Sequence, residues 1–520
     1  MPATRLRRFA LVAAALAIWA PVAVGGARAT VASPATCSTV DPGGGSWVSY
    51  GHDAGNSRTQ LAEAGIGKGN VGSLTARWKF DAVDSLGSGS ISSTPVVADG
   101  CVYVTSSVNN GGMIFALNAD NGSPVWSKFF AAPSPGPLVG GPAVGSPAVD
   151  QGTVFMHLSN PGSPYLVALD DQTGVEKWRS TVATDTADPK LDPARNNTFM
   201  NASPLIVNGL VISGFAGYEA QEWSRGGWSI FDESTGALLV RQYAVPDAEY
   251  QSGHGPGGAS VWGSPAVDGA GGWLYAPTGN PSSAPKEAKL SNSLLKIDLR
   301  NRTSVGFGTM VAAFAGERDS YVARLNSTPA CQDSDLAQKS RVLSWSWSCG
   351  QMDLDFGATP NLFTDTSGHQ IIGDLQKSGV YHAVHADTMV QAWNVKVGLP
   401  CLSCNAASPA TDANGIYVAS APGGYLWSLS LDGRIRWATA VGDGIHYQSV
   451  STANGVVYMV DGYGFLDGWN AATGVPLLKR DMAKDTGDNN EVNQGSSGVS
   501  IARHMVFAAV NGWVVAYKAP

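Results

Sequence analysis

The feature that most constrains the fold of this chain is an internal repeat. Four segments share one plan: an apolar strand, an Asp or Asn, a Thr-Gly or Asn-Gly turn, and a second strand that usually opens near Trp. They are IFALNADNGSPVWSK (114–128), LVALDDQTGVEKWRS (166–180), WSIFDESTGALLVRQ (228–242) and LDGWNAATGVPLLKR (466–480), with weaker copies in LLKIDLRNRTSVGF, VYHAVHADTMVQAW and LWSLSLDGRIRWAT. Alternating apolar residues on both sides of a tight turn predict a β-hairpin with one buried face in each copy.

Other strand–turn–strand segments, such as STPVVADGCVYVTSS and GSPAVDQGTVFMHL, lie between these hairpins. Four strands in a period of about 50 residues are typical of propeller blades. The chain ends supply one more blade, because the final WVVAYK lacks a following Trp strand and LTARWKF (74–80) is an unpaired strand of that kind. We predict an all-β, eight-bladed β-propeller of four-stranded antiparallel blades, with the ring closed by pairing the N- and C-terminal strands. Seven blades are the alternative, since the LLKIDLRNRTSVGF copy is degenerate and a long insertion follows it.

The composition favours one unit of this kind. Although the chain has 520 residues, only 14% of them are charged, whereas it holds 63 Gly, 16 Trp and 15 Tyr. Such usage suits many short strands joined by tight turns. The formal net charge of −8 leaves no basic surface for nucleic acid and no polybasic patch for membranes. We therefore expect small molecules or neutral polymers as partners.

The first residues have the build of a secretory signal peptide. Residues 1–29 combine a basic start, an apolar stretch and a small-x-small ending at 27–29. An uncleaved membrane anchor is the alternative, and no other apolar run is long enough for a membrane span. We expect residues 30–520 to form a single propeller domain that is secreted or periplasmic.

An extracytoplasmic location would allow the six cysteines to oxidise. Cys331 and Cys349 bracket one loop segment and Cys401 and Cys404 form a close pair, which leaves Cys37 with Cys101, but six cysteines permit many pairings and the sequence does not choose. A c-type haem would require His after the second Cys of CxxC, where Asn405 stands. Covalent haem is therefore not expected.

Function is expected where the repeat is broken. Trp126, Trp178, Trp393 and Trp437 recur at one repeat position, so we interpret them as packing between blades. The departures from the repeat are Glu219 in a Gly-rich stretch, Trp262 away from the usual Trp position, Asn280 in a Gly-Asn-Pro turn, Asp355 in GQMDLDFGATP, and Lys377 in LQKSGVY. Carboxylate and amide oxygens of this kind are hard ligands that suit Ca²⁺.

This set resembles the pyrroloquinoline-quinone (PQQ)-dependent alcohol dehydrogenases, which are eight-bladed quinoproteins, and is most similar to the polyvinyl alcohol dehydrogenase branch. The likeness covers nearly the whole chain after the leader, beginning with WVSYGHDAGNSR, which looks like the family's W-x-x-Y-G-x-D-x-x-N-x-R opening. The resemblance implies that Glu219, Asn280 and Asp355 bind Ca²⁺, that Trp262 stacks on PQQ, and that Asp355 and Lys377 are catalytic; Lys377, Glu219 and Asn280 would also contact the cofactor.

The chemistry that this resemblance implies is oxidation of alcohol groups, secondary or polymeric ones such as polyvinyl alcohol, to carbonyls. Ca²⁺ would act as a Lewis acid on the quinone, and a carboxylate would take the alcohol proton as hydride leaves the substrate carbon. Since the chain has no haem segment, the electrons would pass to a separate acceptor such as a cytochrome c. The adjacent Cys-Cys pair of many relatives is also missing.

Several alternatives stay open at this point. Asp353 could be the base, and Asp355 would then take the position of the extra carboxylate in lanthanide-dependent quinoproteins; the continuation DFGATP favours Asp355 as base and Ca²⁺ as metal. Each residue also has a structural explanation. Asp355 or Asn280 could cap a turn, and Glu219 could be a solvated loop carboxylate, with Glu222 as the metal ligand in its place. Lys377 could lie on the surface, and Trp262 could belong to the core. At the level of function, the alternatives are a non-catalytic propeller that serves as a protein-binding scaffold, and a sensor that binds quinone without turnover.

Overall fold

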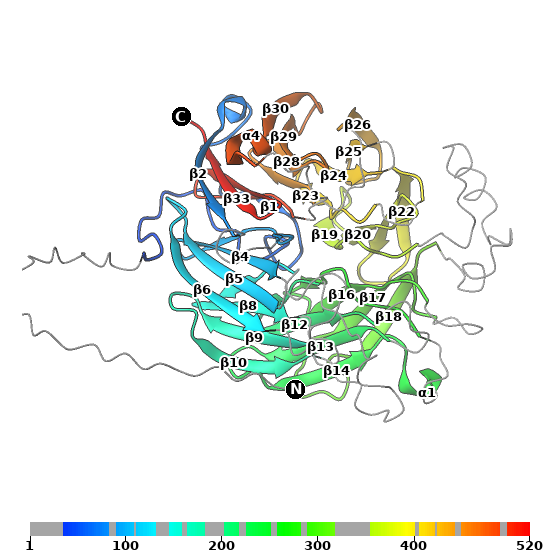
Figure 1. Cartoon of the computed structure of the whole chain (residues 1–520). Coiled ribbons are helices and arrows are strands. Elements are labelled where there is room, and N and C mark those ends of the chain that lie inside the picture. Colours follow the sequence, from blue (N-terminus) through cyan, green and yellow to red (C-terminus); the bar gives the residue numbers. More distant parts are fainter. Residues whose placement is uncertain are drawn as a thin grey trace, which may run out of the picture. The chain divides into compact units, whose positions relative to one another are not determined.

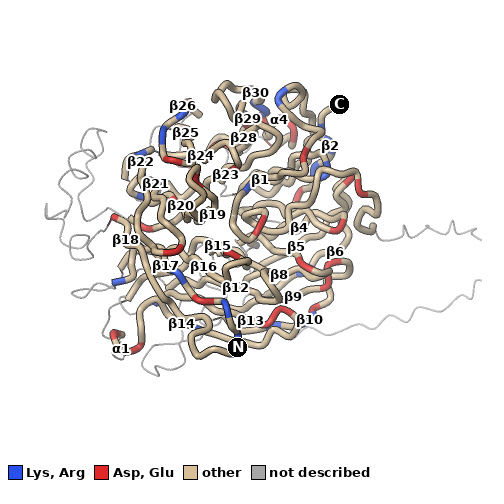
Figure 2. Tube along the Cα trace, turned by 180° about the vertical axis from the view of Figure 1, so that it is seen from behind, with Lys and Arg blue, Asp and Glu red and all other residues tan. Residues whose placement is uncertain are grey.

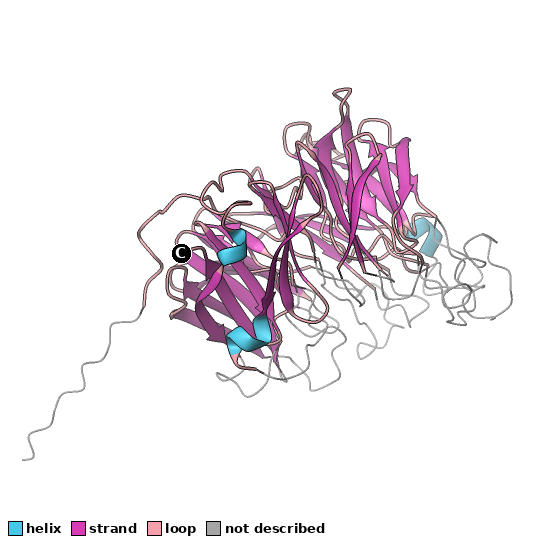
Figure 3. Cartoon of the chain, turned by 90° about the horizontal axis from the view of Figure 1, so that it is seen from above, coloured by secondary structure: helices cyan, strands magenta, loops and turns pink. Residues whose placement is uncertain are grey.

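The computed structural model describes residues 35–82, 90–108, 111–131, 145–158, 164–182, 202–217, 225–250, 257–281, 289–317, 354–400, 405–421, 424–441, 449–488 and 497–520. In these residues the strands form eight sheets, which are the blades of a propeller (Figure 1). Helical structure is limited there to a 3-10 turn at Val71–Ser73 and to the short helices α1 (Asp247–Tyr250) and α4 (Met482–Thr486) (Figure 3). The prediction of an all-β, eight-bladed propeller is confirmed, and the seven-bladed alternative is wrong.

The blades follow one another along the chain, and each runs from an innermost to an outermost strand. The first four blades are β3 (Val96–Ala98), β4 (Cys101–Val108), β5 (Gly111–Asn118) and β6 (Pro124–Ala131); β7 (Ala148–Asp150), β8 (Thr153–Leu158), β9 (Tyr165–Asp170) and β10 (Glu176–Thr181); β11 (Leu205–Val207), β12 (Leu210–Phe215), β13 (Gly227–Asp232) and β14 (Leu238–Tyr243); and β15 (Ala266–Asp268), β16 (Trp273–Pro277), β17 (Ser293–Asp298) and β18 (Met310–Ala315). The other four are β19 (Asn361–Thr364), β20 (Gln370–Leu375), β21 (Val380–His385) and β22 (Gln391–Lys396); β23 (Ala410–Asp412), β24 (Gly415–Ser420), β25 (Tyr425–Leu429) and β26 (Ile435–Ala440); β27 (Ser451–Ala453), β28 (Val456–Val460), β29 (Phe465–Asn470) and β30 (Pro476–Asp481); and β31 (Ser500–Ala502), β32 (Met505–Val510), β33 (Trp513–Lys518) and β2 (Thr75–Asp81).

The eighth blade is completed by strands from both ends of the described chain, as predicted. β2 pairs antiparallel with β33, from Thr75 opposite Lys518 to Asp81 opposite Trp513. This pairing covers the edge that β33 would otherwise leave open. One feature departs from the expected four strands per blade: the short strand β1 (Thr59–Gln60) adds to the seventh blade in parallel with β27.

The repeated tryptophans pack between blades, which confirms their interpretation. Trp178 on β10 donates from Nε1 to the carbonyl oxygen of Glu233 in the next blade, at 3.0 Å. Its ring lies against Gly236 of the Thr-Gly turn, where a Cβ would come within 2.6 Å of the ring carbons. The equivalent rings lie against equivalent glycines: Trp126 against Gly174, Trp393 against Gly433 and Trp437 against Gly474. The Gly of each turn therefore makes room for the Trp of the preceding blade.

A second set of contacts joins the blades at their inner ends. A Ser or Thr precedes the innermost strand of most blades, and its backbone N–H donates to the hydroxyl of the equivalent residue in the next blade. The bonds run from Thr94 to Ser146 (2.8 Å), Ser146 to Ser203 (2.9 Å), Ser203 to Ser264 (2.8 Å), Thr359 to Ser408 (3.1 Å), Ser408 to Ser449 (3.4 Å) and Gly498 to Thr94 (2.9 Å). We call these residues the hydroxyl ring. Within the described residues this ring lacks a bond from Ser264 to Thr359, between the fourth and fifth blades, and from Ser449 to Gly498, which has no side chain.

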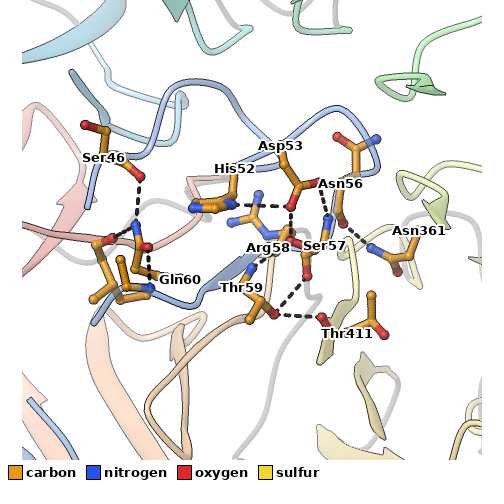
Figure 4. Close-up of polar contacts among 12 residues, drawn as sticks. Ser46, His52, Asp53, Asn56, Ser57, Arg58, Thr59, Gln60, Asn361 and Thr411 are labelled. Atoms are coloured by element: carbon orange, nitrogen blue, oxygen red, sulfur yellow. Dashed lines mark hydrogen bonds and ion pairs between the residues drawn. The ribbon is translucent and has the colours of Figure 1, made fainter. Parts of the chain in front are cut away.

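Residues 45–60, which we call the hub segment, lie along the innermost strands at the centre of the ring (Figure 4). Trp47 pairs with Val97 of β3 through both backbone bonds, at 2.7 and 2.9 Å. The carbonyl oxygens of Val48, Ala54, Gly55, Ser57 and Arg58 then accept, in that order, from the N–H groups of Val149, Val267, Leu362, Thr411 and Thr452. Through these bonds the hub segment contacts the first, second, fourth, fifth, sixth and seventh blades in the order in which the chain forms them.

The side chain of Arg58 anchors this segment. It is fully buried and donates to the carbonyl oxygens of Tyr50 and Val450 and to the hydroxyl of Ser451. Its guanidinium carbon lies 4.7 Å from the ring centroid of Tyr50, a cation–π contact. Burial lowers the pKa of Arg58 to about 10, so the side chain remains charged at neutral pH.

One of the three proposed cysteine pairs is present: Cys37 is bonded to Cys101 at the start of β4. The other four cysteines lie outside the described residues, as does the proposed signal peptide boundary. In the part of the chain that is described, no helix has the length and apolar character needed to cross a bilayer. Lys and Arg are scattered among Asp and Glu along the trace rather than gathered in one stretch (Figure 2), as expected from the low charge of the sequence.

Candidate active site

The site lies between the fourth and fifth blades. Trp262 precedes β15 and Asn280 follows β16, whereas Asp355 precedes β19 and Lys377 follows β20. Successive strands of a blade are antiparallel, so the connection into the first strand and the turn after the second strand lie at the same end of the blade. The repeat therefore brings all four residues to the same end of two neighbouring blades.

Asp355 is the centre of this group. Its side chain is only 1% exposed, and both carboxylate oxygens accept hydrogen bonds. The indole Nε1 of Trp262 donates to Oδ2 at 2.9 Å, and the backbone N–H of Asn280 donates to Oδ1 at 2.8 Å. The ammonium of Lys377 lies 3.4 Å from Oδ2. A buried carboxylate needs such donors, because burial without them would strongly favour its neutral form.

Lys377 makes three contacts with the group. Its backbone N–H donates to the carbonyl oxygen of Asp355 at 2.9 Å, so the two residues are held together by main chain as well as side chain. Its Nζ also lies 4.8 Å from the ring centroid of Trp262. The turn that carries Lys377 is tied to the next blade, because the amide of Asn405 donates to the Lys377 carbonyl oxygen at 3.2 Å. Lys377 is buried, with 7% of its side chain exposed, so it is not the surface residue of the alternative explanation.

Glycines allow the Trp262 ring to lie close to the backbone. A Cβ at Gly357, two residues after Asp355, would lie 2.5 Å from the ring of Trp262. A Cβ at Gly263 would lie 2.4 Å from the carbonyl oxygen of Ala358. Trp262 is half-buried. The fourth and fifth blades thus approach each other at contact distance beside a partly accessible aromatic ring, which is not the fully buried core Trp of the alternative explanation.

Asn280 is held by main-chain bonds on both sides. Its carbonyl oxygen accepts from Ala259 N–H at 3.0 Å, and Gly279 N–H donates to the Ser260 carbonyl oxygen at 2.8 Å. Asn280 is 2% exposed. The backbone N–H, rather than the side chain, contacts Asp355. The backbone of Asn280 is thereby fixed against the buried carboxylate of Asp355.

Behind Asp355, the buried side chain of Gln376 joins the two ends of the long insertion. Its Nε2 donates to the carbonyl oxygens of Glu317 at 2.6 Å and Leu354 at 2.7 Å. Its Oε1 accepts from the N–H of Glu317 at 3.0 Å and from the hydroxyl of Ser378 at 3.1 Å. The imidazole Nε2 of His382 lies 3.1 Å from the same oxygen and donates to it, because an amide oxygen can only accept. Burial lowers the pKa of His382 to about 4, so the ring is neutral.

Not every expected site residue can be placed. Glu219, its rival Glu222 and the alternative base Asp353 lie outside the described residues. In the described part of the chain, no three His, Cys, Asp or Glu side chains gather as a metal site. Sequence reasoning assigned no site role to Gln376 or Asn405, because neither residue breaks the repeat.

The comparisons with known proteins agree with this architecture. The family model described as glucose/ethanol/alcohol dehydrogenase, β-propeller domain, matches residues 47–285, and that of the outer membrane protein assembly factor BamB matches residues 338–520. A polyvinylalcohol dehydrogenase of Pseudomonas sp is 26% identical over 66% of this chain and 49% of its own. A 1-butanol dehydrogenase (cytochrome c) of Thauera butanivorans is 28% identical over 34% of this chain and 23% of its own. The solved structure of a europium-containing methanol dehydrogenase has a TM-score of 0.66 at 16% identity, covering 90% of each chain.

The eight blades and these matches define a β-propeller. Residues 47–285 are similar to the β-propeller domain of the glucose, ethanol and alcohol dehydrogenases. The chain spans about half or less of the length of the curated relatives that it matches.

Proposed function

We propose that this protein is a PQQ-dependent dehydrogenase that oxidises alcohol groups to carbonyls, with Asp355 as the base. The observation that carries the proposal is the buried Asp355 carboxylate, which accepts from Trp262 and Asn280 and pairs with Lys377. A carboxylate held by such donors, next to a half-buried aromatic ring, can remove a proton from a bound alcohol. The known relatives are named for this class of reaction.

The described residues fit a flat redox cofactor and a cation. The Trp262 ring lies over Gly357, where no side chain intervenes, and it can stack on a planar quinone. Lys377 offers a positive charge on the same ring at 4.8 Å, which suits the carbonyls and carboxylates of PQQ. Bound PQQ would supply the electrophilic carbonyl that receives hydride, and a bound metal ion would polarise that carbonyl.

The metal that we propose is Ca²⁺, held by Asp355 and Asn280 together with Glu219. Lanthanide-dependent quinoproteins carry an extra carboxylate two residues after the base, and Gly357 stands at that position. A Cβ there would lie 2.5 Å from the Trp262 ring, so the packing of Trp262 disfavours any side chain at this point. Hard oxygen ligands without His or Cys agree with Ca²⁺.

In the reaction, the described residues hold and move one proton. Asp355 takes the hydroxyl proton of the substrate, and Lys377, 3.4 Å from Oδ2, stabilises the carboxylate before that transfer. The Trp262 and Asn280 N–H groups orient the carboxylate, because they occupy one lone pair on each oxygen. The burial of Asp355 restricts bulk water from the transferring proton.

The finer assignments are extensions of the same proposal. Secondary or polymeric alcohols such as polyvinyl alcohol are the proposed substrates, because the polyvinylalcohol dehydrogenase of Pseudomonas sp matches a longer part of this chain by sequence than the 1-butanol dehydrogenase does. A separate cytochrome c is the proposed electron acceptor, as in the name of the Thauera enzyme. We also propose that residues 1–29 direct the protein out of the cytoplasm. A scaffold function is not favoured: the assembly-factor match covers the repeat, which both classes share, and it does not account for the buried Asp355–Lys377 pair.

The test is reconstitution of the purified protein with PQQ and Ca²⁺, followed by dye reduction with a panel of alcohols that includes polyvinyl alcohol. We expect Asp355→Asn to lower kcat by about 100-fold to 10,000-fold, because the amide cannot accept the proton. PQQ binding should remain measurable in this variant by quenching of tryptophan fluorescence. Asp432→Asn, an exposed turn residue of the sixth blade, is the matched control and should keep wild-type kcat. Equal kcat for Asp355→Asn and wild type, or no PQQ binding by the wild type, would refute the proposal.

A further inference from the structure

The hub segment contacts the blades of the candidate site at one of the two intervals where the hydroxyl ring is interrupted. Asn56 donates from Nδ2 to the carbonyl oxygen of Pro265 at 2.9 Å and to that of Pro360 at 3.3 Å. These prolines directly follow Ser264 and Thr359, two neighbouring ring residues that have no bond to each other. Asn56 thus bridges the fourth and fifth blades in place of the missing hydroxyl bond.

The backbone on either side of Asn56 divides its bonds between the same two blades. The Ala54 carbonyl oxygen accepts from Val267 of β15 at 2.7 Å, and the Gly55 carbonyl oxygen accepts from Leu362 of β19 at 2.8 Å. The Asn56 carbonyl oxygen accepts from the side-chain amide of Asn361 (Figure 4). Residues 54–56 therefore fill the gap between the inner ends of these two blades.

The conformation of Asn56 suits this position. Its φ of 55° is in the left-handed region, which Asn adopts more readily than most residues. The side chain is 1% exposed, and a Cβ at Gly51 would lie 1.9 Å from its Oδ1, so Gly51 makes room for it. Because Nδ2 faces two carbonyl oxygens, the orientation of the amide is defined and an acid at this position would meet only acceptors.

The contacts of the candidate site cross the interval that Asn56 bridges. Trp262 lies three residues before Pro265, and Asp355 lies five residues before Pro360. The 2.9 Å bond from Trp262 Nε1 to Asp355 Oδ2 joins the two connections. A change of a few tenths of an ångström in the blade spacing would reach this bond through only three to five residues of buried backbone.

We propose that Asn56 is a positioning residue that sets the spacing of the fourth and fifth blades and thereby the Trp262–Asp355 contact. Its consequence for catalysis rests on the function proposed above. The geometric consequence does not, because it concerns a hydrogen bond within the protein itself.

The test compares Asn56→Asp with Thr59→Val. Thr59 belongs to the same hub segment and donates its hydroxyl to the Thr411 carbonyl oxygen at 2.7 Å, at the sixth blade (Figure 4). Both variants lose a buried hydrogen bond of the hub segment, but only the first one loses a bond at the site interval. Asn56→Gly, which tolerates a positive φ, is the second variant in case the acid does not fold.

The first readout is the indole N–H resonance of Trp262 in protein labelled with ¹⁵N-tryptophan and assigned with Trp262→Phe. Asn56→Asp or Asn56→Gly should shift this resonance and speed its exchange with solvent at least several-fold, and Thr59→Val should leave it unchanged. The second readout is turnover of the reconstituted enzyme, where kcat should fall about 10-fold or more with little change in KM for the Asn56 variants only.

The outcomes separate the two proposals. If the wild type has no dehydrogenase activity and the Trp262 resonance still responds only to the Asn56 variants, the proposed function fails and the positioning role stands. If the resonance is unchanged in the Asn56 variants, or responds equally to Thr59→Val, the positioning role is overturned. Failure of both Asn56 variants to fold, with a folded Thr59→Val, would also overturn it, since Asn56 would then be needed for the whole ring rather than for one interval.

Discussion

At the scale of residues, the polar groups of the blade interiors are held in defined protonation states by what surrounds them. Asp355 has three N–H donors, whereas burial lowers the pKa values of the imidazoles of His157 and His382 to about 4. Gln376 connects these two kinds of environment, because it accepts a hydrogen bond from neutral His382 and donates one to the carbonyl oxygen of Leu354, the residue before Asp355. Single residues of either kind can therefore be tested without touching the proposed base.

His157 should make stability depend on pH. Its Nδ1 donates to the Ala202 carbonyl oxygen at 2.7 Å, and burial lowers its pKa to about 4, compared with 6.5 for an ordinary His. Between pH 6.5 and 4 the unfolded chain binds a proton that the folded chain does not, so the free energy of unfolding falls with falling pH, by about 3 kcal/mol in all. His157→Asn removes the titration, and denaturation with urea at several pH values should show its disadvantage relative to the wild type shrinking as pH falls. Exposed His369→Asn is the control, and a difference that is constant with pH for His157→Asn would contradict the prediction.

Gln376 should control the geometry of Asp355. Gln376→Glu replaces the Nε2 donor with an oxygen that faces the carbonyl oxygens of Glu317 and Leu354. We expect repulsion to displace Leu354 and to lower kcat about 10-fold or more. Gln370→Glu on the exposed start of β20 makes the same chemical change and should have no effect on kcat. If the two variants give the same kcat, the bonds of Gln376 have no part in positioning Asp355.

At the scale of elements, one contact recurs around the ring: the outermost strand of a blade places a Trp over the turn glycine of the next blade. The turn glycine meets two requirements at once: it adopts a positive φ, and it leaves space for the Trp ring where another residue would have a Cβ. The two requirements can be separated, since another glycine of the same backbone type has an empty environment.

Gly236→Ala tests this contact. The added Cβ would lie 2.6 Å from the Trp178 ring at a φ of 71°, and we expect the free energy of unfolding to fall by about 2–4 kcal/mol. The control is Gly368→Ala, which has a φ of 88° and nothing within 4 Å of the added Cβ, so it should lose only the part due to backbone conformation, about 1 kcal/mol. Equal losses in urea denaturation would show that the Trp178 contact contributes nothing beyond the turn.

The hairpins were predictable from the sequence because alternation and turn residues are local signals. The closing pair of strands was predictable because LTARWKF had no partner nearby, and Trp262, Asn280, Asp355 and Lys377 because they break the repeat. The path of the hub segment was not predictable, since residues 45–60 have no periodicity and their hydrogen-bond partners are set by the assembled ring. The hydroxyl ring repeats visibly before Pro in several blades, but an isolated Ser-Pro or Thr-Pro pair signals only the start of a strand.

At the scale of the whole molecule, the ring depends on links between distant parts of the chain. The disulfide from Cys37 to Cys101 fixes the start of the described chain to the first blade, and β2 joins β33 across more than 400 residues. Both links lie close to the ends of the hub segment, so they hold that segment in the ring from either side.

Removal of the disulfide should destabilise the molecule. The bond closes a loop with a sequence separation of 64 residues, for which the chain-entropy model gives a stabilisation of about 4 kcal/mol. Cys37→Ser with Cys101→Ser should therefore lower the free energy of unfolding by about 2–4 kcal/mol in denaturant titrations. Each single variant should lose as much as the double variant, because either change removes the cross-link. A double variant as stable as the wild type would show that the hub segment is held without it.

The hub segment also sets the order in which the molecule can be completed. Its partners at the inner strands run from Val97 in the first blade to Thr452 in the seventh, so residues synthesised early acquire most of their neighbours late. Such long-range contacts slow folding, because the entropy cost of closing a large loop comes before the stabilisation that the contact provides. In a chain still emerging from the ribosome or a translocation pore, residues 45–60 would lack many of their hydrogen-bond partners until the last blades have been formed. Assembly of the candidate site, which this segment bridges, would then be among the final events of maturation.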